Sequence, residues 1–139
     1  MRIRVVLFDL YATLLEVGPP PADADRRWQR LFRDALHTEP PLGRVEFYAA
    51  CSQVVARHHE TARRQGVPWP EVQWPVVVGE VIPAVAALSA PAREAFLLAQ
   101  VEASRTITLA PETATLLRSL RGHGLTLGIV SNAQAYTWR

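Results

Sequence analysis

Two short apolar runs lie near opposite ends of the chain, and each leads directly into polar residues. The first spans roughly Ile3 to Phe8, is rich in valine, and predicts a buried strand that ends on Asp9. The second spans 125–130 and is followed by Ser131 and Asn132. Open α/β sheets bind ligands at the carboxyl ends of their strands, so these polar residues are candidates for a site. A cap of a turn or of a helix start is the alternative role for Asp9.

The region between the two runs has the spacing of helices, and clusters of Pro and Gly divide it into segments. Asp23 or Asp25 is expected to cap the first helix, and Ser89 the fourth. Pro83 is expected to kink or end the third helix. No strand is expected between the two terminal runs. The predicted helices cover about 23–37, 45–65, 71–87, 89–104 and 113–121.

The composition is that of an ordinary globular protein and argues against several classes of function. The net charge of +2 is small and the arginines are dispersed, so no nucleic-acid partner is expected. No apolar run is long enough to span a bilayer and no signal-type cleavage site is present, so neither a membrane partner nor a targeting segment is expected. Cys51 is the only cysteine, which favours the reducing cytoplasm.

The two apolar runs and the polar residues after them resemble two motifs of the haloacid dehalogenase superfamily of aspartyl-nucleophile hydrolases. Asp9, Tyr11 and Thr13 match the first motif, which is Asp-x-Asp/Tyr-x-Thr after an apolar strand. Ser131 and Asn132 match the second motif, an apolar strand ending in Ser or Thr, often as Ser-Asn. A Pro, a predicted helix and a Gly precede the second strand, in the order typical of the family.

This resemblance implies an α/β fold with a partial Rossmann-like core of parallel strands and an inserted helical cap. The core would consist of residues 1–18 and 106–139, and the cap of residues 19–105. Two strands are fewer than such a core needs, so we expect uncovered apolar surface and self-association through it.

The resemblance makes Asp9 the catalytic nucleophile, because a carboxylate attacks well when held in a dry, oriented site. Tyr11 stands where phosphatase members carry a second Asp as general acid. A halide leaves without protonation, so Tyr11 favours carbon–halogen chemistry; packing under the cap is its alternative role. Ala12 stands where the family usually has Gly, and a positive φ there would strain it.

The remaining motif residues would orient the nucleophile or bind the substrate. Thr13 would bond the loop backbone or orient Asp9, with a plain ST-turn as the alternative. The Ser131 hydroxyl and the Asn132 amide would bind a substrate oxygen or the Asp9 carboxylate. Capping of a helix that begins near Ala133 is a further role for this pair, compatible with the first.

Arg30 is the candidate for holding a substrate carboxylate in a bidentate pair, as a 2-haloacid would require. It is one of four arginines on one predicted helix, and a solvated charged face is the alternative. Trp69 and Trp74 are expected to pack in the core, with the lining of a pocket as the alternative. His58 and His59 are adjacent, point apart, and are expected on the surface rather than on a metal. The four arginines are Arg26, Arg27, Arg30 and Arg33.

Members of the superfamily carry two further motifs after the second one, a Lys or Arg and then one or two acids. This sequence contains no Lys, and no acid follows Glu112. It is therefore expected to be the N-terminal portion of a longer hydrolase and to be inactive by itself.

The activity expected of the intact hydrolase is attack by Asp9 on a small phosphorylated or 2-halogenated acid, so a small anion is the expected partner. A phosphatase would use Mg²⁺, held by the Asp9 carboxylate and the Tyr11 backbone carbonyl, whereas a dehalogenase would need no cofactor. Two alternatives remain. The chain could be an inactive binding or assembly module that acts through its cap, or a second chain could supply the missing motifs.

Overall fold

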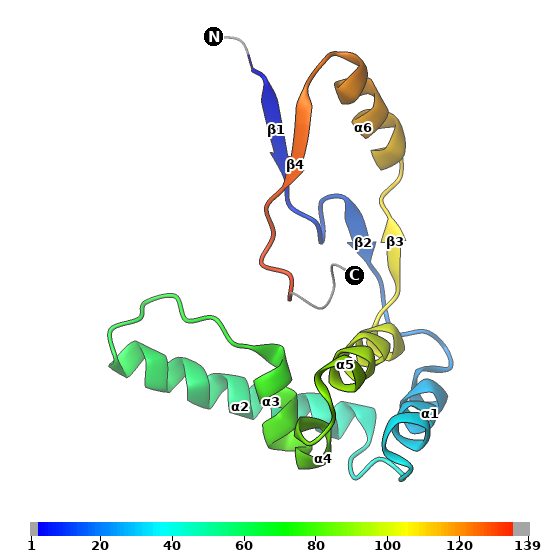
Figure 1. Ribbon diagram of the computed structural model, residues 1–139, viewed down its shortest axis with the longest axis vertical. Helices are drawn as coiled ribbons and strands as arrows, with labels where there is room; N and C mark the ends of the chain where they lie inside the picture. Colours follow the sequence, from blue (N-terminus) through cyan, green and yellow to red (C-terminus); the bar gives the residue numbers. More distant parts are fainter. Residues whose placement is uncertain (1–2, 135–139) are drawn as a thin grey trace.

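The computed structural model describes residues 3–134 and has a mixed α/β fold (Figure 1). The four strands form two separate two-stranded sheets, and helices α1 to α5 gather at one end of the molecule. In chain order the elements of the described residues are β1 (Val5–Phe8), β2 (Leu15–Val17), α1 (Ala24–Leu36), α2 (Arg44–Arg64), α3 (Trp74–Val81), α4 (Pro83–Ala86), α5 (Ala90–Ser104), β3 (Ile107–Leu109), α6 (Thr113–Gly122) and β4 (Thr126–Ile129).

The parallel pairing of β1 with β4 confirms the two strands predicted near the chain ends. Phe8 lies opposite Ile129, so both strands end at the same edge of the sheet. A parallel sheet normally buries both of its faces. Here Ile3, Val5 and Leu7, which alternate along the chain and share one face, are 65%, 52% and 61% exposed. The predicted uncovered apolar surface is therefore confirmed.

The prediction that no strand lies between the terminal runs is wrong, because β2 pairs with β3 in an antiparallel ladder. Leu15 lies opposite Leu109, and Val17 lies opposite Ile107. Each strand has only three residues, which is too short for a period of two to be recognised in the sequence. The pairing arises from contact between two segments that are far apart along the chain.

Beyond β2 and β3, the two segments that lead into and out of α1–α5 are bonded to each other, and we call them the junction. The Gly18 N–H donates to the Thr106 carbonyl at 2.8 Å. The N–H and the hydroxyl of Thr106 both donate to the Pro19 carbonyl, at 3.0 and 3.1 Å. A Cβ atom on Gly18 would lie 2.3 Å from the Thr106 hydroxyl oxygen, so a larger residue there would displace this hydroxyl from its bond to Pro19.

Helices α1 to α5, which we call the helical part, contain nearly all of the buried side chains. Four rings contact one another in the order Phe47, Trp28, Phe32 and Phe96, with centroids of neighbouring rings 4.8 to 5.3 Å apart. Valine and leucine side chains from α3, α4 and α5 complete this core. The helical part therefore carries the main hydrophobic core of the described chain. Apart from Ile82, which lies between α3 and α4, the buried residues outside these helices, within 3–134, are Leu14 and Thr113.

The third predicted helix is present, with changed ends and a break. It begins at Trp74 rather than at 71, because Pro75 and not Pro70 occupies its first turn. It ends at Val81, and Pro83 opens α4, which confirms the predicted break at this proline.

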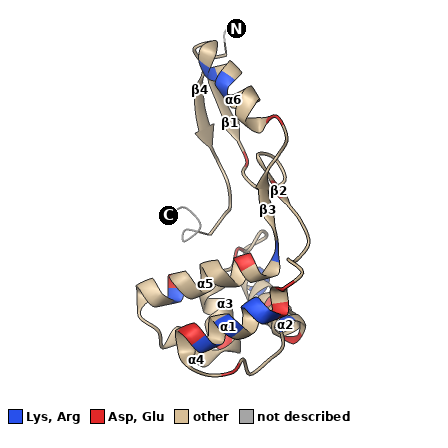
Figure 2. Cartoon of the chain, turned by 90° about the vertical axis from the view of Figure 1, so that its right-hand side faces the viewer, with Lys and Arg blue, Asp and Glu red and all other residues tan. Residues whose placement is uncertain are grey.

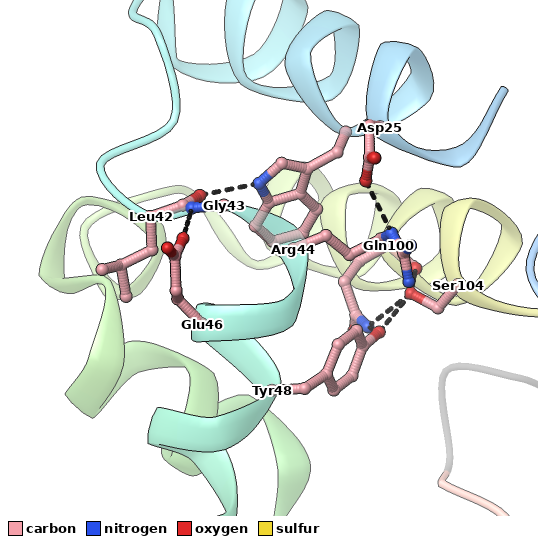
Figure 3. Close-up of polar contacts among 9 residues, drawn as sticks. Asp25, Leu42, Gly43, Arg44, Glu46, Tyr48, Gln100 and Ser104 are labelled. Carbon is pink, nitrogen blue, oxygen red and sulfur yellow. Dashed lines mark hydrogen bonds and ion pairs between the residues drawn. The ribbon is translucent and has the colours of Figure 1, made fainter.

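The side chains predicted to cap the first and fourth helices stand at the predicted positions but do not form capping hydrogen bonds. Asp23 and Ser89 occupy the N-cap positions of α1 and α5, but neither side chain makes a capping hydrogen bond. Asp23 instead accepts a bond from Arg27 at 2.8 Å, and this contact lowers the pKa of the Asp23 carboxyl. At the start of α2 the Glu46 carboxylate accepts the Gly43 N–H at 2.6 Å (Figure 3).

Charged residues lie mainly on the helices, whereas β1 and β4 contain none (Figure 2). The four arginines of α1 are exposed, as expected of a solvated face. The prediction that Trp69 packs in the core is wrong: its side chain is 88% exposed, in a loop where prolines flank it on both sides. No helix within 3–134 combines the length and the apolar character needed to cross a membrane.

The state of Cys51 offers a test of the helical core. Cys51 is buried on α2, and burial raises the pKa of its thiol to about 11. We expect iodoacetamide at pH 8 to label Cys51 at least about a hundredfold more slowly in the native chain than in denaturant, because the nucleophilic thiolate is both scarce and enclosed. Mass spectrometry of timed samples measures the rate. Rapid native labelling would contradict this packing.

Candidate functional site

The loop after β1 places Asp9 at the carboxyl edge of the parallel sheet. One carboxylate oxygen of Asp9 accepts the Leu10 N–H at 2.7 Å. The Leu10 carbonyl in turn accepts the N–H groups of Leu14 and Leu15, at 3.0 and 2.9 Å. These bonds fold the loop into a tight turn, in which Ala12 has a φ of 58°. The strain expected at Ala12 is therefore present.

The end of β4 lies beside this loop. The Val130 N–H donates to the Phe8 carbonyl at 2.9 Å, which extends the parallel ladder past both strands. Because the two strands run in the same direction, Asp9 and Ser131 emerge at one edge of the sheet. The Ser131 hydroxyl oxygen is buried and has no hydrogen-bond partner among the described residues. A buried hydroxyl is normally bonded, so this one is an exception within the part of the chain that the structure describes.

The segment after β4 reaches the helical part (Figure 1). The side-chain oxygen of Gln134 accepts the backbone N–H of Trp74 at 3.1 Å, and its amide nitrogen donates to the Val72 carbonyl at 3.4 Å. This contact closes one side of a cavity of about 240 Å³, which we call the site cavity. The residues that line the site cavity are Tyr11, Val72, Trp74, Gln100, Val101, Arg105, Asn132, Ala133 and Gln134.

A polar network from the helical part forms one wall of the site cavity. Gln100 is buried on α5, and its side-chain oxygen accepts the Trp74 indole N–H at 2.9 Å. Its amide nitrogen donates to the Tyr48 hydroxyl, which also bonds Ser104 (Figure 3). Burial raises the pKa of Tyr48 above its ordinary value, so the phenol stays protonated at neutral pH. The network fixes the orientation of the Trp74 ring.

Among the described residues that line the site cavity, Arg105 is the charged one, and none is Asp or Glu. The site cavity is therefore positively charged. Arg105 follows α5 and precedes β3, and it also lines a second cavity of about 510 Å³ together with Tyr11. An arginine beside hydroxyl and amide groups, with no carboxylate among the lining residues, is suited to binding an anion.

The structure brings together some of the residues predicted from the sequence and separates others. Tyr11 and Asn132 line the site cavity, and Asp9 lies at the same sheet edge but is exposed and is not among the lining residues. Thr13 lies exposed at the tip of the loop, and its hydroxyl makes no hydrogen bond within the part of the chain described. Arg30 lines a different hollow, between α1 and α5.

Sequence reasoning missed Gln100 and Arg105. Gln100 stands among the buried apolar positions of α5, and a polar residue on such a face is a signal of a buried hydrogen-bond network. No sequence pattern distinguishes Arg105 from the other arginines, because its location depends on where the return segment meets the loop after β1.

The candidate site offers few ligands to a metal ion. Within residues 3–134 no three His, Cys, Asp or Glu side chains gather in a group that could hold an ion. Asp9 and the Tyr11 carbonyl are oxygen donors of the kind that Mg²⁺ prefers, and Mg²⁺ commonly takes its other ligands from water and substrate phosphate. These two oxygen atoms are suited to supply two of the ligands in the coordination shell of Mg²⁺.

Comparison with protein-family models and with curated proteins finds no match for this chain.

The strain at Ala12 predicts that Ala12→Gly stabilises the chain. A left-handed conformation costs an L-residue about 1–2 kcal/mol, which glycine avoids at a smaller entropic cost. We expect the free energy of unfolding in urea to rise by about 0.5–1 kcal/mol. Ala56→Gly, on the exposed face of α2, is the control and should lower it by about 1 kcal/mol. A loss of stability in Ala12→Gly would show that the turn differs from the one described.

The unbonded Ser131 hydroxyl predicts a second stabilising substitution, Ser131→Ala. Removing a buried donor that has no partner should raise the free energy of unfolding by about 1 kcal/mol. The control is Ser104→Ala, which loses the bond from its hydroxyl to the Gln100 carbonyl at 2.6 Å and the bond between its hydroxyl and that of Tyr48. It should lower the free energy of unfolding by about 1–2 kcal/mol. Urea unfolding of both variants measures the difference, and equal losses would refute the unbonded state of Ser131.

Proposed function

We propose that this chain carries the nucleophile and cap of a hydrolase of the haloacid dehalogenase type, which acts on a small phosphorylated or 2-halogenated acid. The observation that carries the proposal is the parallel pairing of β1 with β4. It sets Asp9 beside Ser131 and Asn132 at one sheet edge, next to a cavity without a lining carboxylate. A nucleophile, hydrogen-bond donors and a cation from separate elements would then face one ligand.

The architecture of the proposal assigns residues 1–18 and 106–139 to a Rossmann-like core and residues 19–105 to its cap. The helical part contains its own core and joins the sheets through the junction, which supports an inserted cap. We also propose a cytoplasmic location, because the lone cysteine, Cys51, is a buried free thiol.

The chemistry would begin with the exposed Asp9 carboxylate. With a 2-haloacid, the carboxylate oxygen attacks the carbon that bears the halogen, the carbon–halogen bond breaks, and halide leaves with its electron pair. Water then cleaves the resulting ester, giving the 2-hydroxyacid, a proton and the restored carboxylate. The Ser131 hydroxyl would donate to a substrate oxygen during the first step.

Tyr11, two positions after Asp9, favours cleavage of a carbon–halogen bond, which we call the halogen route, over cleavage of a phosphate ester. A phosphate ester needs a proton on its leaving oxygen, and the Tyr11 phenol is a weaker acid than a carboxyl group. On the phosphate route, Asp9 and the Tyr11 carbonyl would be the ligands to Mg²⁺, which would supply charge to the transferring phosphoryl group. On the halogen route no metal is required.

A second candidate is a binding module without catalysis. Two observations favour it: Asp9 is not among the residues lining the site cavity, and the sequence contains no Lys. The helical part would then hold a small anion without transforming it.

The test is covalent capture of Asp9 by 2-chloropropionate, read by intact-mass and peptide mass spectrometry. We expect one ester to form slowly on Asp9, because the proposed nucleophile is present while the Lys and the acids of the later motifs are not. Asp9→Asn should reduce labelling and any chloride release to background without changing the circular dichroism spectrum. Glu16→Gln, which removes an exposed carboxylate on β2, is the matched control and should label like the wild type. If Asp9→Asn labels normally, or if Asp9 stays unmodified at saturating substrate, the nucleophile assignment fails and the binding module is favoured.

A further inference from the structure

We propose that Arg105 binds the anionic group of the ligand while Trp74 contacts its body, so that the site cavity selects a small acid with one anionic group and an apolar portion. The inference deepens the proposed function and rests on it, because it concerns the same site. It replaces Arg30 with Arg105 as the residue that recognises the substrate anion.

The position of Arg105 supports this role. Its backbone N–H donates to the Val101 carbonyl at 3.1 Å and closes the last turn of α5, which fixes where the side chain starts. It lines both the site cavity and the neighbouring larger cavity, and Tyr11 lines the same two. Arg105 is therefore located where the helical part meets the loop that follows Asp9.

The charge of Arg105 is not neutralised within the described residues. Arg27 and Glu102 also line the larger cavity. The Arg27 guanidinium pairs with Asp23 at 2.8 Å, and Glu102 does not line the site cavity. Arg105 takes part in none of the ion pairs formed within residues 3–134. A guanidinium without a carboxylate partner can form two parallel hydrogen bonds to a ligand carboxylate or phosphate.

Arg30 also takes part in none of these ion pairs, so it differs from Arg105 in its surroundings. It lies on α1, in a hollow lined by three carboxylates, those of Asp23, Asp34 and Glu102, which would repel an anion. Tyr11 and Asn132 are not among the residues that line that hollow. An anion bound there would not be held beside the end of β1.

Trp74 supplies the apolar wall. Gln100 holds the indole nitrogen, and the Tyr48 ring stacks with Trp74 at a centroid distance of 6.4 Å and an interplanar angle of 16°. Val72 and Val101 line the same cavity. A ligand whose anionic end meets Arg105 would therefore place an apolar portion among these side chains.

The site cavity, of about 240 Å³, suits a small ligand. A short-chain acid fits this space beside Arg105. A single arginine also provides for one anionic group rather than several.

The test is isothermal titration of the full chain with two probes, 2-chloropropionate and inorganic phosphate. Arg105→Gln should weaken binding of 2-chloropropionate by about tenfold to a hundredfold, which is the range for loss of a charge-assisted hydrogen bond. Arg105→Lys should restore part of the loss, because it keeps the charge but not the planar fork. Arg63→Gln on α2 is the matched control and should bind like the wild type. Native Cys51 labelling checks that each variant is folded.

The probes separate the outcomes. If wild type and Arg105→Gln bind 2-chloropropionate equally, or if Arg30→Gln causes the loss instead, the inference is overturned. Phosphate binding tighter than that of 2-chloropropionate, with no effect of Trp74→Ala on either, would overturn the role of the apolar wall.

Failure of the inference is also distinguishable from failure of the proposed function. If binding depends on Arg105 but no ester forms on Asp9, the anion site stands and the hydrolase proposal fails. If Asp9 is esterified at the same substrate concentrations in wild type and Arg105→Gln, the hydrolase proposal stands and Arg105 has no part in recognition.

Discussion

The parallel hydrogen bonding between β1 and β4 is the interaction on which the candidate site depends. It is the only strand pairing in the described chain that joins the first residues to the last, and it sets the ends of both strands at one edge. Asp9 and Ser131 owe their proximity to this ladder and to nothing in the local sequence. Without the ladder, the loop after β1 and the segment after β4 would have no fixed relation.

The two ends of the molecule differ in how they are stabilised. The helical part encloses aromatic and aliphatic side chains around Phe32 and Phe47, which removes them almost completely from water. The sheet end leaves Ile3, Val5 and Leu7 exposed and buries little besides Leu14. The helical part therefore contributes most of the hydrophobic stabilisation, and the sheet end contributes the geometry of the site.

Strongly periodic features were predictable from the sequence, and features set by tertiary contact were not. The apolar runs predicted β1 and β4, the spacing of Trp28 and Phe32 predicted α1, and the ring of Pro83 predicted a break, since each depends on a local physical property. The pairing of β2 with β3 was missed because three residues carry no recognisable period. Within the candidate site, the residues at the strand ends were predicted, but Arg105 was not, because its relation to Tyr11 arises only when the chain returns from α5.

The junction has a consequence for how this chain can vary. Gly18, Pro19 and Thr106 hold the two ends of the helical part next to each other, so the chain leaves the sheet end and returns to it at one narrow point. Closing a long loop adds little entropy beyond that of a short one once its ends are fixed. A helical part of different size or shape would leave the register of the strands unchanged, but it would alter the site cavity, because Trp74, Gln100 and Arg105 line that cavity together with Tyr11 and Asn132.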